Sequence, residues 1–131
     1  MDEDVAQTLR VLRGHLAELV PAADTAEVDR QVAALLRESD DERLLGQLTT
    51  LYGAVPGLEA WVSSVLADPL HRPPAAQDRA VRGVDRPPGD GEPVAADRFG
   101  CPERDYIWYR LSVAMPVPRC PTHDRVLIRE D

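Results

Sequence analysis

Residues 69–96 divide the chain, because this stretch carries neither a helical nor a strand repeat. It contains six prolines and three glycines, which interrupt both kinds of regular structure. A partly extended linker, with at most a helical turn over residues 75–84, is the structure that this composition favours. The sequence therefore predicts two modules, residues 1–68 and residues 97–131, joined by a linker over residues 69–96.

The first module shows the periodicity of amphipathic helices. The apolar stripe of its first helix is Val5, Leu9, Leu12, Leu16 and Leu19. Capping-box patterns that begin at Asp24 and Ser39 predict the starts of a second and a third helix, and a short fourth helix ends at Pro69. Short connections favour antiparallel neighbours, so we expect a small bundle of about four short helices.

The net charge of −8 is concentrated in this helical half of the chain. Residues 1–68 hold 13 acidic side chains and five arginines, whereas residues 97–131 hold six of each. Many of the acidic residues stand at helix starts, where the helix dipole favours them. The charge predicts a solvated acidic surface that would attract a basic partner. All 15 basic residues are arginine and asparagine is absent, which indicates a GC-rich bacterial genome.

The second module changes to a strand pattern. Residues 106–113 are rich in aromatic and β-branched side chains, and residues 125–129 read as a second short strand. Four of the six aromatic residues fall between Phe99 and Tyr109, which predicts a small core of its own. The fold class expected for the whole chain is therefore α+β, a helical bundle followed by a small β-module.

Two turns in the second module carry the residues best suited to bind a metal. Cys101 and Cys120 are each followed by proline, and His123 follows the second cysteine at the C-x-x-H spacing. That spacing lets one loop present a sulfur and an imidazole to one cation. Thiolates also bind iron, but the histidine favours zinc.

Residues 97–131 resemble zinc-ribbon and rubredoxin-like modules in Cys101-Pro102, Tyr106-x-Trp108, Cys120-Pro121 and His123. The resemblance implies a structural zinc held between the two turns. Those families usually supply a second cysteine from the first turn, where this chain has Arg104. Asp105 is then the preferred fourth ligand, and the weaker candidates are Glu103, His71 on the linker, or water.

A Cys101–Cys120 disulfide and a pair of free thiols are the alternatives to a metal site. The acidic start of the chain lacks the charge and the apolar core of a secretory signal, and no membrane-spanning segment is evident, so we expect a cytoplasmic protein. A stable disulfide is rare in that compartment. A module of about 35 residues needs some staple to offset its ordering entropy, and a structural metal can supply it.

The function expected from these features is that of a non-enzymatic adaptor with a structural zinc. The architecture is similar to small accessory proteins of bacterial signalling and defence systems, which implies a protein partner. Tyr106 and Trp108 are candidate partner contacts if one face of their strand is displayed; otherwise they cover the metal site. The oligomeric state stays open.

Nucleic-acid binding through the β-module is the alternative function. Its six arginines and its aromatic side chains suit such a role, but its balanced charge opposes it. A small metalloenzyme is disfavoured, because no acid–base partner accompanies the cysteines. His15, beside the apolar stripe of the first helix, is expected to be a surface or boundary residue.

Overall fold

The computed structural model describes residues 2–77, 97–110 and 115–130, and it has the expected α+β fold. Most of the predicted linker, residues 78–96, and the end of the predicted strand at 106–113 lie outside the described residues. The helical elements are α1 (Glu3–Gly14), the 3-10 helix η1 (Leu16–Glu18), α2 (Ala22–Arg37), α3 (Asp41–Ala54) and α4 (Leu58–Ala67). The strands are β1 (Asp97–Gly100), β2 (Ile107–Arg110) and β3 (Ile128–Glu130).

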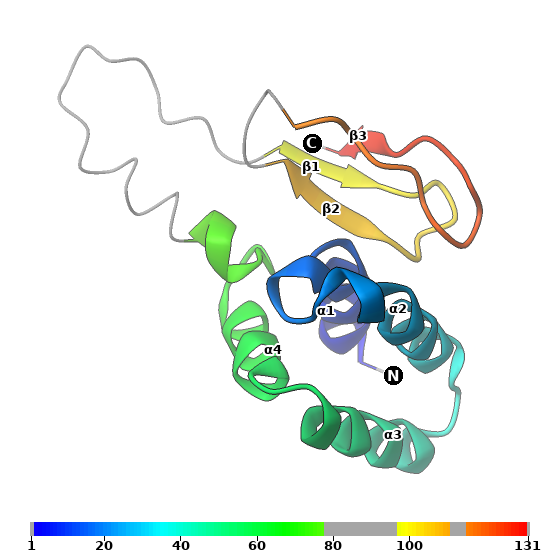
Figure 1. Ribbon diagram of the computed structural model, residues 1–131, viewed down its shortest axis with the longest axis vertical. Coiled ribbons are helices and arrows are strands. Elements are labelled where there is room, and N and C mark those ends of the chain that lie inside the picture. Colours follow the sequence, from blue (N-terminus) through cyan, green and yellow to red (C-terminus); the bar gives the residue numbers. More distant parts are fainter. Residues whose placement is uncertain (1, 78–96, 111–114, 131) are drawn as a thin grey trace, which may run out of the picture.

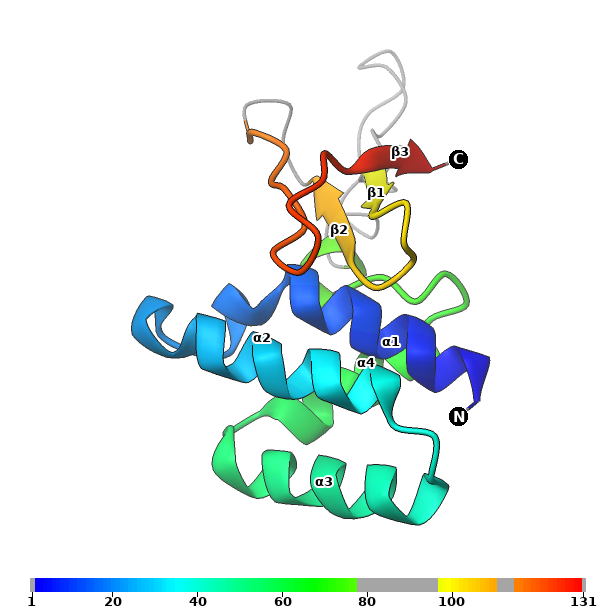
Figure 2. The ribbon, with the colours of Figure 1, turned by 90° about the vertical axis from the view of Figure 1, so that its right-hand side faces the viewer.

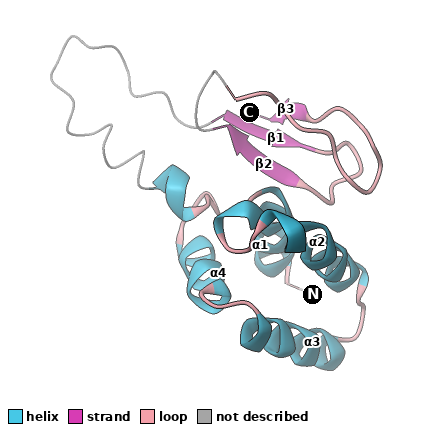
Figure 3. Ribbon diagram, in the orientation of Figure 1, coloured by secondary structure: helices cyan, strands magenta, loops and turns pink. Residues whose placement is uncertain are grey.

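The sheet lies over α1 and α2, and α3 lies on the side of the bundle away from it (Figures 1 and 2). Its three strands are antiparallel in the order β2-β1-β3, so β1 is central although the sequence did not indicate it. The strands lie on one side of the molecule and the helices on the other (Figure 3). Among the described helices, none combines the length with the apolar character needed to cross a bilayer.

Four element boundaries differ from the expectations. The first helix ends at Gly14, and the apolar stripe continues in η1. Helix α2 begins directly after Pro21, so Asp24 lies in its first turn and does not cap it. Asp40, and not Ser39, caps α3, because its carboxylate accepts hydrogen bonds from the second and third N–H groups of that helix. The last strand starts at Ile128, three residues later than expected.

Strand β2 contributes to two hydrophobic cores. Ile107 and Tyr109 belong to the main core, which is otherwise built from the helices and includes Leu12 and Leu16. The residues of the small core are Phe99, Cys101, Tyr106, Trp108, Cys120 and Leu127. The small core of the β-module is therefore present. On β2, Trp108 belongs to this small core, whereas its neighbours Ile107 and Tyr109 join the sheet to the helical bundle. The division into modules stays a prediction.

Helix α1 and strand β2 approach each other closely at Gly14. A Cβ atom on this residue would lie 2.1 Å from the carbonyl oxygen of Ile107 and 3.1 Å from the Cα of Trp108. Both neighbours are backbone atoms, which cannot move aside without shifting the strand. The sheet can therefore pack this closely against α1 only because residue 14 is glycine.

We expect Gly14→Ala to destabilise the protein by about 2 kcal/mol or more, as other overpacked sites do. Gly46→Ala is the matched control, because nothing lies within 4 Å of a Cβ at that position of α3. The control should stabilise the helix by about 0.5–1 kcal/mol. Urea unfolding of both variants measures the difference, and equal effects would contradict the close approach.

His15 is buried, which corrects the expectation that it is a surface or boundary residue. Its side chain is 6% exposed, and its Nε2 accepts a hydrogen bond of 3.0 Å from the backbone N–H of Tyr109. Burial lowers the pKa of His15 to about 4 from its ordinary value of 6.5. The neutral imidazole thus joins the end of α1 to β2.

The free energy of unfolding should therefore fall as the pH drops from about 6.5 towards 4. In that range the unfolded chain binds a proton at His15 that the folded chain does not, whereas above pH 6.5 neither state does. Between pH 7 and pH 5 the loss from this residue is about 2 kcal/mol. Denaturant unfolding of wild type and His15→Gln at both pH values isolates it, and parallel pH profiles would contradict the account.

Candidate metal centre

Four side chains with metal-binding donor atoms meet between the two cysteine turns. They are Cys101 and Asp105 from the turn between β1 and β2, and Cys120 and His123 from the turn that precedes β3. One donor atom from each lies within 4.8 Å of all the others, and no other such group of His, Cys, Asp and Glu occurs among the described residues. The three ligands that the spacing favoured and the preferred fourth ligand, Asp105, are thus brought together.

The distances between these donor atoms suit one tetrahedral cation. His123 Nδ1 lies 3.8 Å from the sulfur of Cys101, 3.8 Å from the sulfur of Cys120 and 3.2 Å from an Asp105 oxygen. The other Asp105 oxygen lies 3.6 Å from the Cys120 sulfur. In a tetrahedral zinc site, typical bond lengths place sulfur about 3.5 Å from nitrogen or oxygen, and nitrogen about 3.3 Å from oxygen.

The backbone of both turns explains why these side chains converge. The N–H of Arg104 donates to the carbonyl of Cys101 (2.9 Å), and the N–H of Asp124 donates to that of Cys120 (2.7 Å). Arg104 and Asp124 both have positive φ, 61° and 49°, which reverses the chain beside the donor groups. The N–H of Glu103 also points at the Cys101 sulfur, at 3.5 Å.

The cluster favours a cation electrostatically. Both cysteines are buried and are free thiols, not a disulfide. Burial, together with the neighbouring Cys120 and Asp105, raises the pKa of the Cys101 thiol to about 11. Without a cation this thiol stays protonated at neutral pH, because a thiolate there would be desolvated next to other anions. A divalent metal would remove that penalty.

Arg13 of α1 supports the cluster from behind, and sequence analysis missed it. Its side chain is 1% exposed, donates to the Asp105 carbonyl (2.8 Å) and to the Thr122 hydroxyl, and lies 3.4 Å from an Asp105 carboxylate oxygen. Two further hydrogen bonds, of 2.8 and 3.0 Å, join it to Asp29 of α2. Arg13 thereby ties both metal-binding turns to both helices beneath the sheet.

The guanidinium of Arg13 stays protonated in this environment. Burial alone would lower the pKa of its guanidinium, but the hydrogen bonds and charge of Asp29, with the charges of Asp105 and Cys120, raise it above the ordinary value. The guanidinium also lies over the ring of Tyr106, 5.4 Å from its centroid. The guanidinium, 3.4 Å from an Asp105 carboxylate oxygen, holds that side chain in its orientation beside the cluster.

The other candidate residues lie outside the cluster. Glu103 faces Arg125 at 3.7 Å, and His71 lies 3.3 Å from Asp4 at the start of α1. Neither residue belongs to the group of donor atoms, so neither is placed to be the fourth ligand. Tyr106 and Trp108 are 8% and 7% exposed, within the small core beside Cys101 and Cys120. That position is the one expected if they cover the metal site; a partner contact by either residue stays a prediction.

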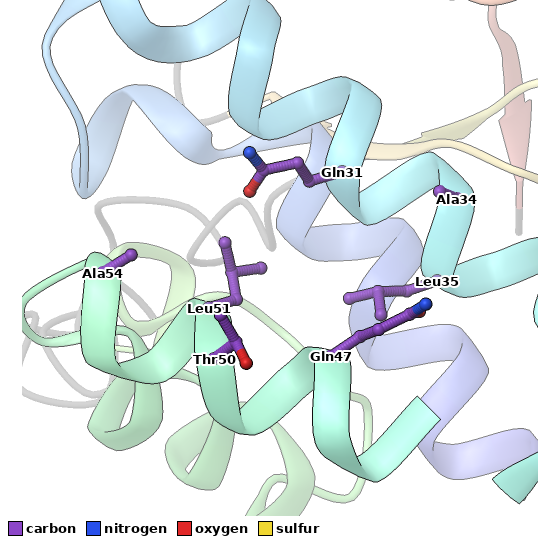
Figure 4. A pocket seen from close by; sticks show the side chains of 7 residues that line it. All are labelled: Gln31, Ala34, Leu35, Gln47, Thr50, Leu51 and Ala54. Carbon is purple, nitrogen blue, oxygen red and sulfur yellow. The ribbon is translucent and has the colours of Figure 1, made fainter. Parts of the chain in front are cut away.

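An apolar groove between α2 and α3 offers no comparable chemistry. It has a volume of about 430 Å³, and Leu35 and Leu51 are the largest apolar side chains that line it (Figure 4). The remaining lining residues are Gln31, Ala34, Gln47, Thr50 and Ala54. None of them is an acid, a base or a thiol, so the Cys-Asp-Cys-His cluster is the better candidate for a functional site.

Comparison of the chain with protein-family models, with curated proteins and with solved structures finds no match. The cluster and its surroundings are therefore the features of the molecule that bear on function.

Proposed function

We propose that Cys101, Asp105, Cys120 and His123 bind one zinc ion, and that this ion holds the β-module together. The observation that carries the proposal is the convergence of four donor atoms, all within 4.8 Å of one another, from two turns that are 15 residues apart in sequence. Two thiolates, an imidazole and a carboxylate are all ligands that zinc accepts. A mixed sulfur, nitrogen and oxygen set suits zinc better than iron, which prefers four thiolates in small turns of this kind.

The zinc is proposed to be structural and the protein non-enzymatic. Four protein donors complete a tetrahedral shell and leave no position for water or substrate, unlike the three-ligand sites of zinc enzymes. Both sulfurs are buried, whereas the side chains of His123 and Asp105 are 35% and 24% exposed. The ion would then act through stability of the fold and not through chemistry.

A protein-binding role, that of an adaptor, fits the remaining surface best. Strand β3 forms an edge of the sheet, and its residue Ile128 is 57% exposed; Val126, which precedes the strand and forms a bridge with Arg119, is 61% exposed. Exposed apolar side chains on an unpaired strand edge are suited to pairing with a partner strand. The acidic helical half favours a partner with a basic surface.

Nucleic-acid binding is less favoured by the same surface. Five of the six arginines of the β-module form ion pairs with carboxylates of this chain: Arg98, Arg110, Arg119, Arg125 and Arg129. Paired guanidinium groups have less to gain from phosphates. Tyr106 and Trp108 are buried and offer no open face for stacking on bases.

The metal content of the purified, reduced protein tests the zinc proposal. We expect about one zinc per chain in the wild type and none in a Cys101→Ser/Cys120→Ser double variant. The Glu103→Gln variant, changed beside the cluster but outside the donor set, should keep its zinc. Absence of metal from the wild type after growth and repurification with added zinc would overturn the proposal.

A further inference from the structure

A second hollow opens directly beside the metal-binding cluster. It has a volume of about 350 Å³ and lies between α1, α2 and the two cysteine turns. Three arginines, one from each helix and one from the first turn, line it: Arg10, Arg37 and Arg104. His123, Thr122 and Asp105 form the wall on the side of the cluster. We call it the arginine hollow.

Two of these arginines lack the carboxylate partners that most others have. Within the described ranges, only Arg37, Arg43 and Arg104 form no ion pair, although the protein is strongly acidic. Arg37 and Arg104 face the same hollow from different elements. Arg10 adds a third guanidinium, whose Nε is buried without a hydrogen-bond partner and whose contact with Glu3 is at the surface. Within the described residues, the charges of Arg37 and Arg104 are thus not neutralised by an ion pair.

The two acidic residues in the wall are engaged elsewhere. Glu103 faces Arg125 at 3.7 Å, and Asp105 faces Arg13 at 3.4 Å while it also belongs to the metal-binding cluster. Two polar hydrogens remain for a ligand. His123 turns Nδ1 towards the cluster, so its Nε2–H is free to donate, and the Thr122 hydroxyl accepts from Arg13 while its own hydrogen stays available.

We propose that the arginine hollow binds a phosphate group. Two unpaired guanidinium groups match the charge of a phosphate dianion at neutral pH, and their planar forks suit its oxygens. Arg37 and Arg104 contact it from opposite elements, Arg10 adds charge, and His123 and Thr122 donate hydrogen bonds. The inference rests on the proposed zinc site through the first turn, which places Arg104, whereas Arg37 stands on α2 independently of it.

Calorimetric titration of the zinc-loaded protein with inorganic phosphate tests the proposal, with phenyl phosphate as a second ligand and acetate as a carboxylate control. We expect saturable phosphate binding that Arg37→Gln and Arg104→Gln each weaken about tenfold or more, since each removes a charge-assisted hydrogen bond. Arg43→Gln should leave the affinity unchanged, because Arg43 also lacks an ion pair but stands on α3, away from the hollow. Tighter binding of phenyl phosphate would assign the site to an ester and equal binding to free phosphate, and both support a phosphate site.

Three results would overturn the proposal: no saturable binding, acetate binding as tight as phosphate binding, or equal weakening by Arg43→Gln. The zinc content of every variant is measured in the same samples. If Arg104→Gln loses its zinc, Arg37→Gln decides the outcome, because its substitution leaves both turns intact. A wild type that holds no zinc would count against the proposed function, whereas a zinc-loaded wild type without phosphate binding would count against the arginine hollow alone.

Discussion

Cys120→Ser should unfold the sheet while most of the helical signal remains. The substitution removes a buried ligand and the sulfur at the centre of the small core, where Cys120 is 0% exposed. A structural zinc supplies on the order of 10 kcal/mol to a small module, far more than that core can replace. The main core keeps all its helical members, so α1 to α4 retain their packing apart from the contacts with Ile107 and Tyr109.

Two signals separate the halves of the molecule in this experiment. Far-ultraviolet circular dichroism reports the helices, and fluorescence reports Trp108 when Trp61 is replaced by phenylalanine, since the chain has two tryptophans. We expect a red-shifted Trp108 emission with circular dichroism close to that of the parent, and a chelator should produce the same result in the parent. An unchanged emission would contradict a structural role for the metal, and a joint loss of both signals would show that helices and sheet unfold as one unit.

Arg13→Met should be the most damaging substitution outside the donor set. It leaves Asp29, 13% exposed, without its guanidinium partner and frees the Asp105 carbonyl and the Thr122 hydroxyl. Breaking a buried ion pair in this way costs about 3–5 kcal/mol, and loss of an outer partner of a ligand weakens metal affinity about 10- to 100-fold. Arg30→Met is the matched control, because Arg30 pairs with Glu27 at the surface and its loss should change stability and zinc affinity little.

A second substitution separates the two roles of Arg13. In Arg13→Met/Asp29→Leu the unpaired carboxylate is gone, so part of the lost stability should return. The zinc affinity should stay low, since the contacts with Asp105 and Thr122 are still missing. Recovery of both stability and affinity in the double variant would mean that Arg13 serves only as the partner of Asp29.

The metal-binding cluster was predictable because its signal is local. Cys101, Cys120 and His123 are recognised by residue type and spacing, and Asp105 is one of the two carboxylates in the first turn, the other being Glu103. The helices were likewise predictable from their apolar stripes. The exact starts of α2 and α3 were not predictable. Asp24 and Ser39 fit a capping pattern as well as the residues that stand at the N-cap positions, Pro21 and Asp40.

The residues that join the sheet to the bundle gave no such local signal. Arg13 and His15 follow the apolar stripe of the first helix as ordinary polar residues, and only the arrival of residues about 90 positions later buries them. Strand β1 has one apolar side chain, Phe99, and owes its central place to pairing with β2 and β3. Long-range packing of this kind overrides local preference, so it becomes visible only in the folded chain.

X-ray absorption at the zinc edge of the loaded protein tests the central claim most directly, because it counts ligands by element. We expect two sulfur neighbours at about 2.3 Å and two nitrogen or oxygen neighbours at about 2.0 Å. The Asp105→Asn variant should keep both sulfurs but show a weakened or water-filled fourth position, since an amide oxygen is a poorer ligand for zinc. A shell without sulfur, or one with a single sulfur among lighter atoms, would contradict a zinc centre built from Cys101, Asp105, Cys120 and His123.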